Sequence, residues 1–264
     1  MTEYVAALPM YDWSEDIGQA DAEWARLRSL IEKAGIRAPA RRALRNADLP
    51  SVPGGIRDRA GKELAPDPAS LPPDELNFHA VWLHPRLLLA QTCWGPLELG
   101  LAEHVTVVGQ PSYEGIEGGR NELYSSAILM RRGGGGVPPP EGEQALVPLD
   151  RLRGRRLAYN SVDSMSGYLA LARDLGAAGE GLAIFPEHVV TGSHRASVVA
   201  VANGEADVCA VDCRSWKLAR LHEPRSVDLE VVGWTSKRKG LPFITSKATP
   251  PDVVAKLRDI LSPA

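Results

Sequence analysis

One stretch decides how this chain is expected to fold: Leu157-Ala158-Tyr159-Asn160-Ser161-Val162-Asp163-Ser164-Met165-Ser166-Gly167-Tyr168. Its first residues are apolar and predict a buried strand, and the hydroxyl-rich residues after them predict a turn that opens a helix. The first N–H groups of a helix have no acceptor inside the helix and point at whatever lies in front of them. Ser164 and Ser166 would add side-chain donors without adding charge. The stretch therefore predicts a site for a small anion at the end of a strand.

The same pattern recurs further along the chain. Val189 and Val190 lead into Thr191-Gly192-Ser193-His194, after which a second helix is predicted. Two helix starts of this kind that face one crevice would bind a small oxyanion.

Composition limits the possible functions. The chain has 264 residues, 44% of them hydrophobic, which is enough for one large core or two smaller ones. Its net charge of -3 gives no electrostatic reason to expect nucleic acid as a partner, so any anion site must be local. Three cysteines, an odd number, lie in or beside apolar runs at Cys93, Cys209 and Cys213, and we expect buried thiols.

Neither export nor membrane insertion is indicated by the sequence as written. The N-terminal residues lack a basic patch followed by an apolar stretch, and no segment reaches the roughly 18 apolar residues that a membrane span needs. The six histidines show no metal-ligand spacing and the cysteines form no C-x-x-C pair. We therefore expect a soluble protein that stays inside the cell, with no metal and no cofactor.

Strands and helices are predicted to alternate along the chain. The predicted strands are Val5–Leu8, Arg41–Leu44, Leu87–Gln91, Val105–Val108, Leu123–Met130, Arg156–Tyr159, Val189–Val190, Val208–Val211, Leu229–Trp234 and Leu241–Thr245. Helices are predicted at both ends, near Ala20–Ala34 and Pro250–Leu261, while the Pro- and Gly-rich residues 45–75 predict a loop. This alternation is typical of α/β proteins whose mainly parallel sheets are flanked by helices.

Parallel sheets bind ligands beyond the carboxyl ends of their strands, which selects the candidate site residues. Those that follow predicted strands are Tyr11, Trp13, Trp94, Ser164, Ser166, Thr191, Ser193, His194 and Asp212.

These segments together resemble a known family, the substrate-binding proteins of phosphate, phosphite and phosphonate ABC transporters. The resemblance depends on residues 158–168, on Thr191-Gly192-Ser193-His194-Arg195-Ala196-Ser197, and on Ala206-Asp207-Val208-Cys209-Ala210-Val211-Asp212. Residues 88–97 and Leu8-Pro9-Met10-Tyr11 extend it toward the N-terminus.

The resemblance implies a two-lobed α/β fold, the type 2 periplasmic-binding-protein fold. One lobe would contain residues 1–122 and 235–264, the other residues 123–234, and a small anion would bind in the cleft between them. The implied partners are that anion and an ABC permease, and we expect a monomer that performs no catalysis. In this family the protein usually works outside the inner membrane, so the resemblance implies a periplasmic location although the sequence shows no leader.

The resemblance also implies site residues. The serine-rich helix start would hold the oxyanion through Ser164 and Ser166, with Met165 at a position where the family has a hydroxyl. The same site would include His194, Asp212 at its wall, and Asn160. Tyr11, Trp13 and Trp94 would contact the ligand from the first lobe, and Tyr124 lies in a strand expected to cross between the lobes.

Other interpretations of the same residues stay open. Ser166, His194 and Asp212 are the ingredients of a hydrolase triad, although the turn lacks the leading glycine of a nucleophile elbow. A cytoplasmic metabolite sensor, or a protein that binds thiamine-type pyrimidine precursors, would also suit the aromatic residues. Each residue also has a purely structural interpretation: a helix cap for the serines, His194 and Asp212, and core packing for the aromatic side chains.

Overall fold

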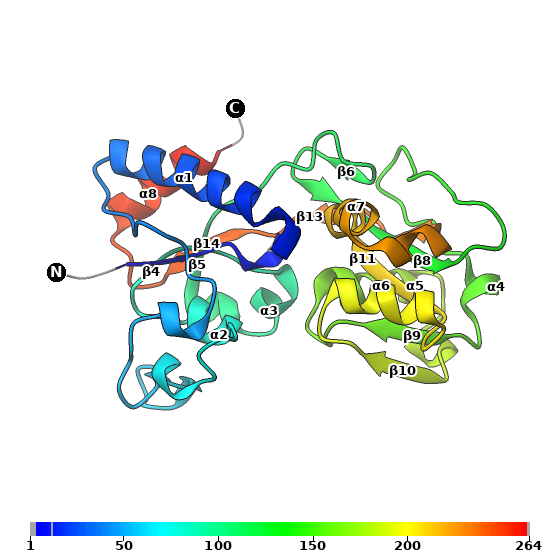
Figure 1. Ribbon diagram of the computed structural model, residues 1–264, viewed down its shortest axis with the longest axis horizontal. Coiled ribbons are helices and arrows are strands. Elements are labelled where there is room, and N and C mark those ends of the chain that lie inside the picture. The colour runs from blue at the N-terminus through cyan, green and yellow to red at the C-terminus, as the bar shows by residue number, and fades with distance from the viewer. Residues whose placement is uncertain (1–3, 12, 263–264) are drawn as a thin grey trace. The chain divides into compact units, whose positions relative to one another are not determined.

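The computed structural model of the protein describes residues 4–11 and 13–262. Its contacts separate the chain into two compact units. Unit 1 comprises Met1–Pro111 and Leu241–Ala264, and unit 2 comprises Ser112–Gly240 (Figure 1). Both ends of the chain therefore build one unit, and the middle of the chain builds the other.

Unit 1 contains a four-stranded sheet in the order β1-β4-β14-β5. Its strands are β1 (Val5–Ala7), β4 (Leu87–Gln91), β5 (Val105–Gly109) and β14 (Phe243–Ser246). β1 is parallel to β4, whereas β14 is antiparallel to both of its neighbours. Three of the four strands run in the same direction, but the sheet is mixed and not mainly parallel as predicted, because the reversed strand β14 from the C-terminal part of the chain lies between β4 and β5.

Helices cover both faces of this sheet. On one face, α1 (Ile17–Lys33) and α8 (Pro251–Leu261) lie side by side (Figure 1), and their apolar side chains pack on Leu88 and Leu89 of β4. On the other face, α2 (Phe78–Trp82) and α3 (Trp94–Glu98) pack on Leu87 and Ala90. The continuous apolar run of β4 therefore contributes to both layers, as expected for a strand that is buried on both faces.

The prediction of a strand at Arg41–Leu44 is wrong. This segment runs along the free edge of β1 but shares only one backbone hydrogen bond with it, from the Ala43 N–H to the Ala6 carbonyl at 2.7 Å. The predicted loop at 45–75 contains a two-stranded ribbon, β2 (Ile56–Arg57) and β3 (Glu63–Ala65), and short 3₁₀ turns. Neither segment adds a strand to the main sheet.

Unit 2 contains a five-stranded sheet in the order β10-β9-β11-β8-β12. Its strands are β8 (Ser126–Arg131), β9 (Arg156–Tyr159), β10 (Glu187–Val190), β11 (Val208–Asp212) and β12 (Leu229–Trp234). β9, β10 and β11 run parallel, and β8 is antiparallel to both β11 and β12. This sheet is also mixed: four strands run in one direction and β8 is reversed between β11 and β12.

The faces of the second sheet are covered by α5 on one side and by α6 and α7 on the other. The helices are α5 (Ala170–Ala177), α6 (His194–Asn203) and α7 (Cys213–His222). Ile128, Leu157 and Val208 of the sheet pack with Leu171 and Leu175 of α5. α6 ends at Gly204, whose left-handed φ of 80° suits the residue after a helix.

The remaining elements are short. A second small sheet in unit 2 is formed by β6 (Gly119–Arg120), β7 (Leu123–Tyr124) and β13 (Arg238–Lys239), and α4 (Leu149–Leu152) precedes β9. Cys93, Cys209 and Cys213 are buried thiols, as predicted, and burial raises the pKa of both Cys209 and Cys213. Within residues 4–11 and 13–262, no helix combines the length and the apolar character needed to traverse a bilayer.

Candidate functional site

The three parallel strands of unit 2 end at one edge of the sheet. Tyr159 at the end of β9 is paired with Val190 at the end of β10, and β11 is in register with β9 beside them. The residues at or just beyond these ends are Asn160, Thr191 and Asp212. The topology therefore gathers three of the predicted site residues at the carboxyl edge of this sheet, where α/β proteins bind ligands.

The serine turn opens a helix, as the sequence predicts. After β9 the chain forms a short π-helix, η6 (Met165–Leu169), which continues directly into α5. Ser164 is its N-cap, and its hydroxyl oxygen accepts a hydrogen bond from the Gly167 N–H at 3.0 Å. Short π-helical segments of this kind often occur at functional sites. The cap uses the oxygen of Ser164 as an acceptor and leaves its hydroxyl hydrogen free to donate, so the turn offers two hydroxyls, Ser164 and Ser166.

Ser166, His194 and Asp212 are brought together. The Ser166 Oγ lies 2.8 Å from the His194 Nε2, and this same nitrogen lies 3.5 Å from the Asp212 Oδ2. Ser166 and Asp212 are 2% and 1% exposed, and the His194 side chain keeps 17% exposure. The three residues come from η6, α6 and β11, so the contact depends on the fold of unit 2 as a whole.

The surroundings of His194 favour the neutral form of its imidazole. Burial lowers the pKa of its imidazole, and the nearby Asp212 carboxylate only partly opposes that effect. His194 is the first residue of α6, so its ring lies near the positive end of the helix dipole. The dipole also disfavours protonation of the imidazole.

The geometry differs from that of a hydrolase triad. A triad needs one ring nitrogen on the serine and the other on the carboxylate. Here Nε2 faces both Ser166 and Asp212, and the buried Nδ1 has no hydrogen-bond partner among the described residues. The ring therefore cannot pass a proton from the serine along to a carboxylate-bound nitrogen.

Asp212 is the N-cap of α7. Its Oδ1 accepts hydrogen bonds from the N–H groups of Arg214 at 3.0 Å and Ser215 at 2.9 Å, and its Oδ2 accepts the Ser215 hydroxyl at 2.6 Å. A buried carboxylate with these bonds has little accepting capacity left for a ligand. The wall position that the resemblance implies is thus occupied by a residue that turns its charge toward α7 and His194.

Asn160 and His194 pack closely around Gly167. A Cβ atom at Gly167 would lie 2.0 Å from the Asn160 Oδ1 and 3.2 Å from the His194 Cε1, so any other residue here would displace the Asn160 amide and press on the imidazole. The Asn160 Oδ1 is buried and has no hydrogen-bond partner among the described residues. Because glycine has no side chain, the Asn160 amide and the His194 imidazole can both lie against the start of η6.

At the second predicted helix start, the side chains of Ser193 and Thr191 form hydrogen bonds within the protein. The Ser193 hydroxyl accepts the Ala196 N–H at 3.1 Å and caps α6. The Thr191 hydroxyl contacts the Tyr159 carbonyl at 3.1 Å and the Ser197 hydroxyl at 2.6 Å. Both side chains stabilise the turn that places His194 against Ser166.

Two buried serines were missed by the sequence reasoning. Ser125 and Ser126 are 0% exposed, and neither hydroxyl has a hydrogen-bond partner among the described residues. Ser126 begins β8 and pairs in register with Asp212. Because β8 is reversed, its first residues lie at the edge where the parallel strands end. We selected residues that follow strands, and these two serines precede one. Two adjacent serines directly before an apolar run could have indicated them.

Four of the other predicted residues lie outside this cluster, whereas Met165 lies in η6 between its two serines. Tyr11, Trp13 and Trp94 belong to unit 1; Tyr11 is buried, and the other two are half-buried. In unit 2, Tyr124 is 1% exposed and its ring centroid lies 5.5 Å from that of Tyr113. Met165 is also buried, and its sulfur lies 3.6 Å from the Arg173 Nη1.

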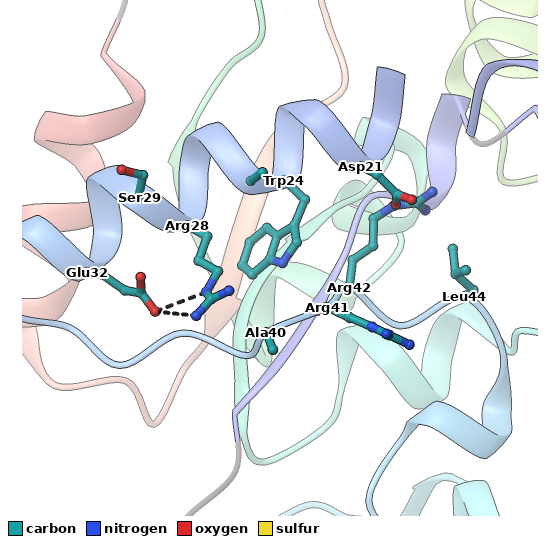
Figure 2. Close-up of a pocket in the computed structure, with 10 residues that line it drawn as sticks. Asp21, Trp24, Arg28, Ser29, Glu32, Ala40, Arg41, Arg42 and Leu44 are labelled. Atoms are coloured by element: carbon teal, nitrogen blue, oxygen red, sulfur yellow. Dashed lines mark hydrogen bonds and ion pairs between the residues drawn. The ribbon is translucent and has the colours of Figure 1, made fainter. Parts of the chain in front are cut away.

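Unit 1 contains open pockets that involve none of the predicted ligand residues. One, of about 570 Å³, lies between α1 and residues 40–44 (Figure 2). Two ion pairs line it, Arg28 with Glu32 at 2.9 Å and Arg42 with Asp21 at 2.9 Å, together with Arg41. A neighbouring pocket of about 630 Å³ shares the segment 40–42. Neither pocket contains a residue that the sequence predicts for the anion site.

Two α/β units, one of them formed by both ends of the chain, define the class of two-lobed periplasmic binding proteins. The sequence model for periplasmic substrate-binding proteins of phosphonate ABC transporters matches residues 102–262, more than half of the chain. The chain belongs to this family. The predictions of the family, the fold class and the main function are thereby confirmed.

Solved structures support the fold. PhnD1 from Prochlorococcus marinus, solved in complex with methylphosphonate, is similar with a TM-score of 0.62 at 14% identity, over 98% of this chain and 83% of that one. A binding protein component of an ABC phosphonate transporter from Pseudomonas aeruginosa gives a TM-score of 0.60 at 14% identity, over 98% and 74% of the two chains. No curated protein matches the chain in sequence.

Proposed function

We propose that this protein binds a small phosphorus oxyanion of the phosphonate class at the carboxyl edge of the unit 2 sheet and delivers it to an ABC permease. The observation that carries the proposal is the position of the Ser166 hydroxyl, held 2.8 Å from His194 at the opening of η6. The helix start supplies N–H donors, and the serine adds a neutral donor beside them.

Buried polar atoms at the same edge support the proposal. The Ser125 and Ser126 hydroxyls and the Asn160 Oδ1 lack hydrogen-bond partners among the described residues. Leaving such groups unpaired costs about 1 to 3 kcal/mol each, so a ligand that reaches any of them would recover that energy. Hydroxyl and amide groups suit the oxygens of a phosphonate, which accept several hydrogen bonds at once.

The acidic residue near this edge does not argue against an anion. Asp212 is 1% exposed and its charge is offset by two N–H groups and one hydroxyl of α7. A carboxylate with these partners repels an anion less than a carboxylate that points at the anion.

In unit 1, Tyr11, Trp13 and Trp94 stay predicted ligand contacts.

Binding is tested by calorimetry with methylphosphonate, phosphite, phosphate, sulfate and a thiamine-type pyrimidine. We expect heat of binding from at least one of the phosphorus oxyanions and a raised melting temperature with the same compound, because a ligand that binds only the native state stabilises it. Binding of the pyrimidine alone would favour the precursor-binding hypothesis instead.

A matched pair of serine variants localises the site. Ser166→Ala should weaken binding by about 1 to 3 kcal/mol, the value of a hydrogen bond to a charged group. Ser161→Ala, in the same turn but before η6, serves as the control and should bind like the unmodified protein. Equal affinity in both variants would remove Ser166 from the site.

A further inference from the structure

We infer that Asp212 is a positioning residue for oxyanion binding: it keeps a hydrogen on the His194 Nε2, so that the Ser166 hydroxyl donates to the ligand instead of to the imidazole. The inference depends on the proposed function, because it explains how the same hydroxyl becomes a donor. It assigns to Asp212 a role in binding without contact with the ligand.

The hydrogen bond between Ser166 and His194 can run in two directions. In one, the Nε2–H donates to the Ser166 Oγ and the hydroxyl hydrogen points elsewhere. In the other, the hydroxyl donates to a bare Nε2 and the ring carries its hydrogen on Nδ1. The distance of 2.8 Å fits both arrangements, so the surroundings of the ring decide between them.

The first deciding observation is the position of Asp212. Its Oδ2 lies 3.5 Å from the His194 Nε2, on the nitrogen that also faces Ser166. A carboxylate oxygen only accepts hydrogens, so it attracts an Nε2–H and repels a bare Nε2 lone pair. Asp212 cannot turn away, because its cap bonds to Arg214 and Ser215 hold it.

The second observation is the environment of the other ring nitrogen. The His194 Nδ1 is buried and has no partner among the described residues. A hydrogen placed there would be a buried donor without an acceptor, which folded proteins rarely tolerate. Burial also keeps the ring from carrying both hydrogens, since it lowers the pKa of His194. Both observations therefore favour the Nε2–H form.

The consequence falls on Ser166. When its oxygen accepts from His194, its hydrogen must point to another acceptor. The hydroxyl makes no other hydrogen bond among those the structure records for the described residues. A ligand oxygen at the opening of η6 would receive it. The geometry thus supplies a donor without a positive charge and selects ligands that present an accepting oxygen.

The hydrogen position can be measured without any ligand. In protein labelled with ¹⁵N at histidine, long-range ¹H–¹⁵N spectra distinguish the two neutral forms, and His194→Gln identifies the signals of His194. We expect a protonated Nε2 and a bare Nδ1 near neutral pH. A protonated Nδ1 with a bare Nε2, or a doubly protonated ring, would overturn the inference whatever the protein binds.

Asp212→Asn tests the role of the carboxylate. Asparagine keeps an oxygen for the two N–H groups of α7 and is a good N-cap, but it presents an NH₂ group to His194. We expect the hydrogen of His194 to move to Nδ1 and the affinity for methylphosphonate to fall at least about tenfold. A melting temperature close to that of the unmodified protein shows that the cap has survived.

Glu223→Gln is the matched control. Glu223 caps the next turn, η8 (Pro224–Asp228), and pairs with Arg195, the residue after His194, without contacting the imidazole. Both variants remove one negative charge near α6. If Asp212 acted only as a repelling charge, both changes would strengthen anion binding. The inference predicts weaker binding for Asp212→Asn alone, so the sign of the change decides the matter.

A combined variant shows whether Asp212 acts through Ser166. Asp212→Asn added to Ser166→Ala should cause no more than about a twofold further loss, because the donor it orients is already absent. If the two substitutions reduced the affinity independently, so that the fold-losses of the single variants multiplied in the double variant, the inference would be overturned. Failure of the unmodified protein to bind methylphosphonate or any other phosphorus oxyanion would overturn the proposed function instead, and the histidine spectra would still test the position of the hydrogen.

Discussion

The two units share a sheet design but differ in what lies at the ends of their strands. Each main sheet has parallel strands and a single reversed strand, β14 in unit 1 and β8 in unit 2. In unit 1 the strands β4 and β5 are followed by Thr92 and Gln110, which are neutral. In unit 2 the corresponding edge holds Ser166, His194 and Asp212 in direct contact.

The difference shows that strand topology alone does not make an anion site. Both topologies gather polar residues at one edge, as the parallel-strand rule requires. Among the described residues, unit 2 alone adds a helix start whose serine hydroxyl contacts an imidazole that lies beside a buried carboxylate. We therefore expect changes at this edge of unit 2 to alter ligand affinity, and comparable changes in unit 1 that spare Tyr11, Trp13 and Trp94 to alter stability alone.

The largest effect is expected from Gly167→Ala. The new methyl group would lie 2.0 Å from the Asn160 Oδ1 and 3.2 Å from the His194 Cε1, so both must shift. We expect a loss of about 3 kcal/mol in methylphosphonate binding, roughly a hundredfold in affinity by calorimetry. Gly176→Ala in α5, where no atom lies within 4 Å of the new Cβ, is the control and should leave binding unchanged. Equal affinities would contradict the packing described around Gly167.

Next in size is the ion pair that anchors β11. Asp207 accepts from the Arg156 Nε and Nη2 at 3.0 Å each, and these bonds lower the pKa of its carboxyl group. Asp207→Asn should reduce the free energy of unfolding by about 2 kcal/mol in urea titrations near neutral pH. The contribution should be present above the ordinary pKa of about 3.9 and disappear as the pH falls below it, because the unfolded state then takes up a proton first.

The counterpart in unit 1 is the pair of Arg28 and Glu32, whose side chains are 38% and 45% exposed. Glu32→Gln should change the free energy of unfolding by no more than about 0.5 kcal/mol. The side chains of Arg156 and Asp207 are 32% and 16% exposed. If Glu32→Gln lowered the free energy of unfolding as much as Asp207→Asn does, the greater burial of the Asp207 pair would not explain its contribution.

Smaller effects are expected from two helix caps, one in each unit. Ser164 accepts the Gly167 N–H at 3.0 Å, and Asn77 accepts the Ala80 N–H at 2.9 Å at the start of α2. Each alanine variant should lose about 1 kcal/mol of stability. Calorimetry should show weaker methylphosphonate binding for Ser164→Ala only, since that cap holds η6 in place. Weakened binding in both variants would show that affinity simply follows stability.

The smallest effect concerns the buried histidines. Burial lowers the pKa of His194 in unit 2 and of His84 in unit 1. For a lowered pKa the unfolded state binds the proton first, so stability is full above about pH 6.5 and declines as the pH falls. Between pH 7.5 and 6.0 one such group contributes at most about 0.8 kcal/mol. His194→Gln and His84→Gln should each reduce this pH dependence in urea titrations, and an unchanged slope in either variant would show that its ring is not held neutral.

Much of this architecture was predictable because periodic apolar runs and glycine or proline boundaries are local signals. The run Leu87–Gln91 and the turn from Tyr159 to Gly167 fold as their sequences indicate. The prediction at Arg41–Leu44 failed because pairing with β1 depends on a neighbour distant in sequence, and one backbone hydrogen bond is all that joins these described residues. The predicted strand Leu123–Met130 is divided at Ser125 into β7 and β8, which belong to different sheets.

The site was less predictable than the fold. The rule that ligands bind beyond the ends of parallel strands identified residues that follow those strands. Whether the oxygen of a given hydroxyl caps a helix depends on tertiary distances, which cannot be read from the local sequence. Ser164 and Ser166 look alike in the sequence, yet only the first accepts the Gly167 N–H. Ser125 and Ser126 were missed because the direction of β8 is set by its partners on either side.

The split of unit 1 between the two ends of the chain has a consequence for biosynthesis. On the ribosome, the continuous segment Ser112–Gly240 is complete before β14 and α8 emerge. Until then β4 and β5 lack the strand that joins them, and their unpaired edges are open to association with other nascent chains. A chaperone that shields those edges during translation would therefore protect the N-terminal segment far more than the middle one.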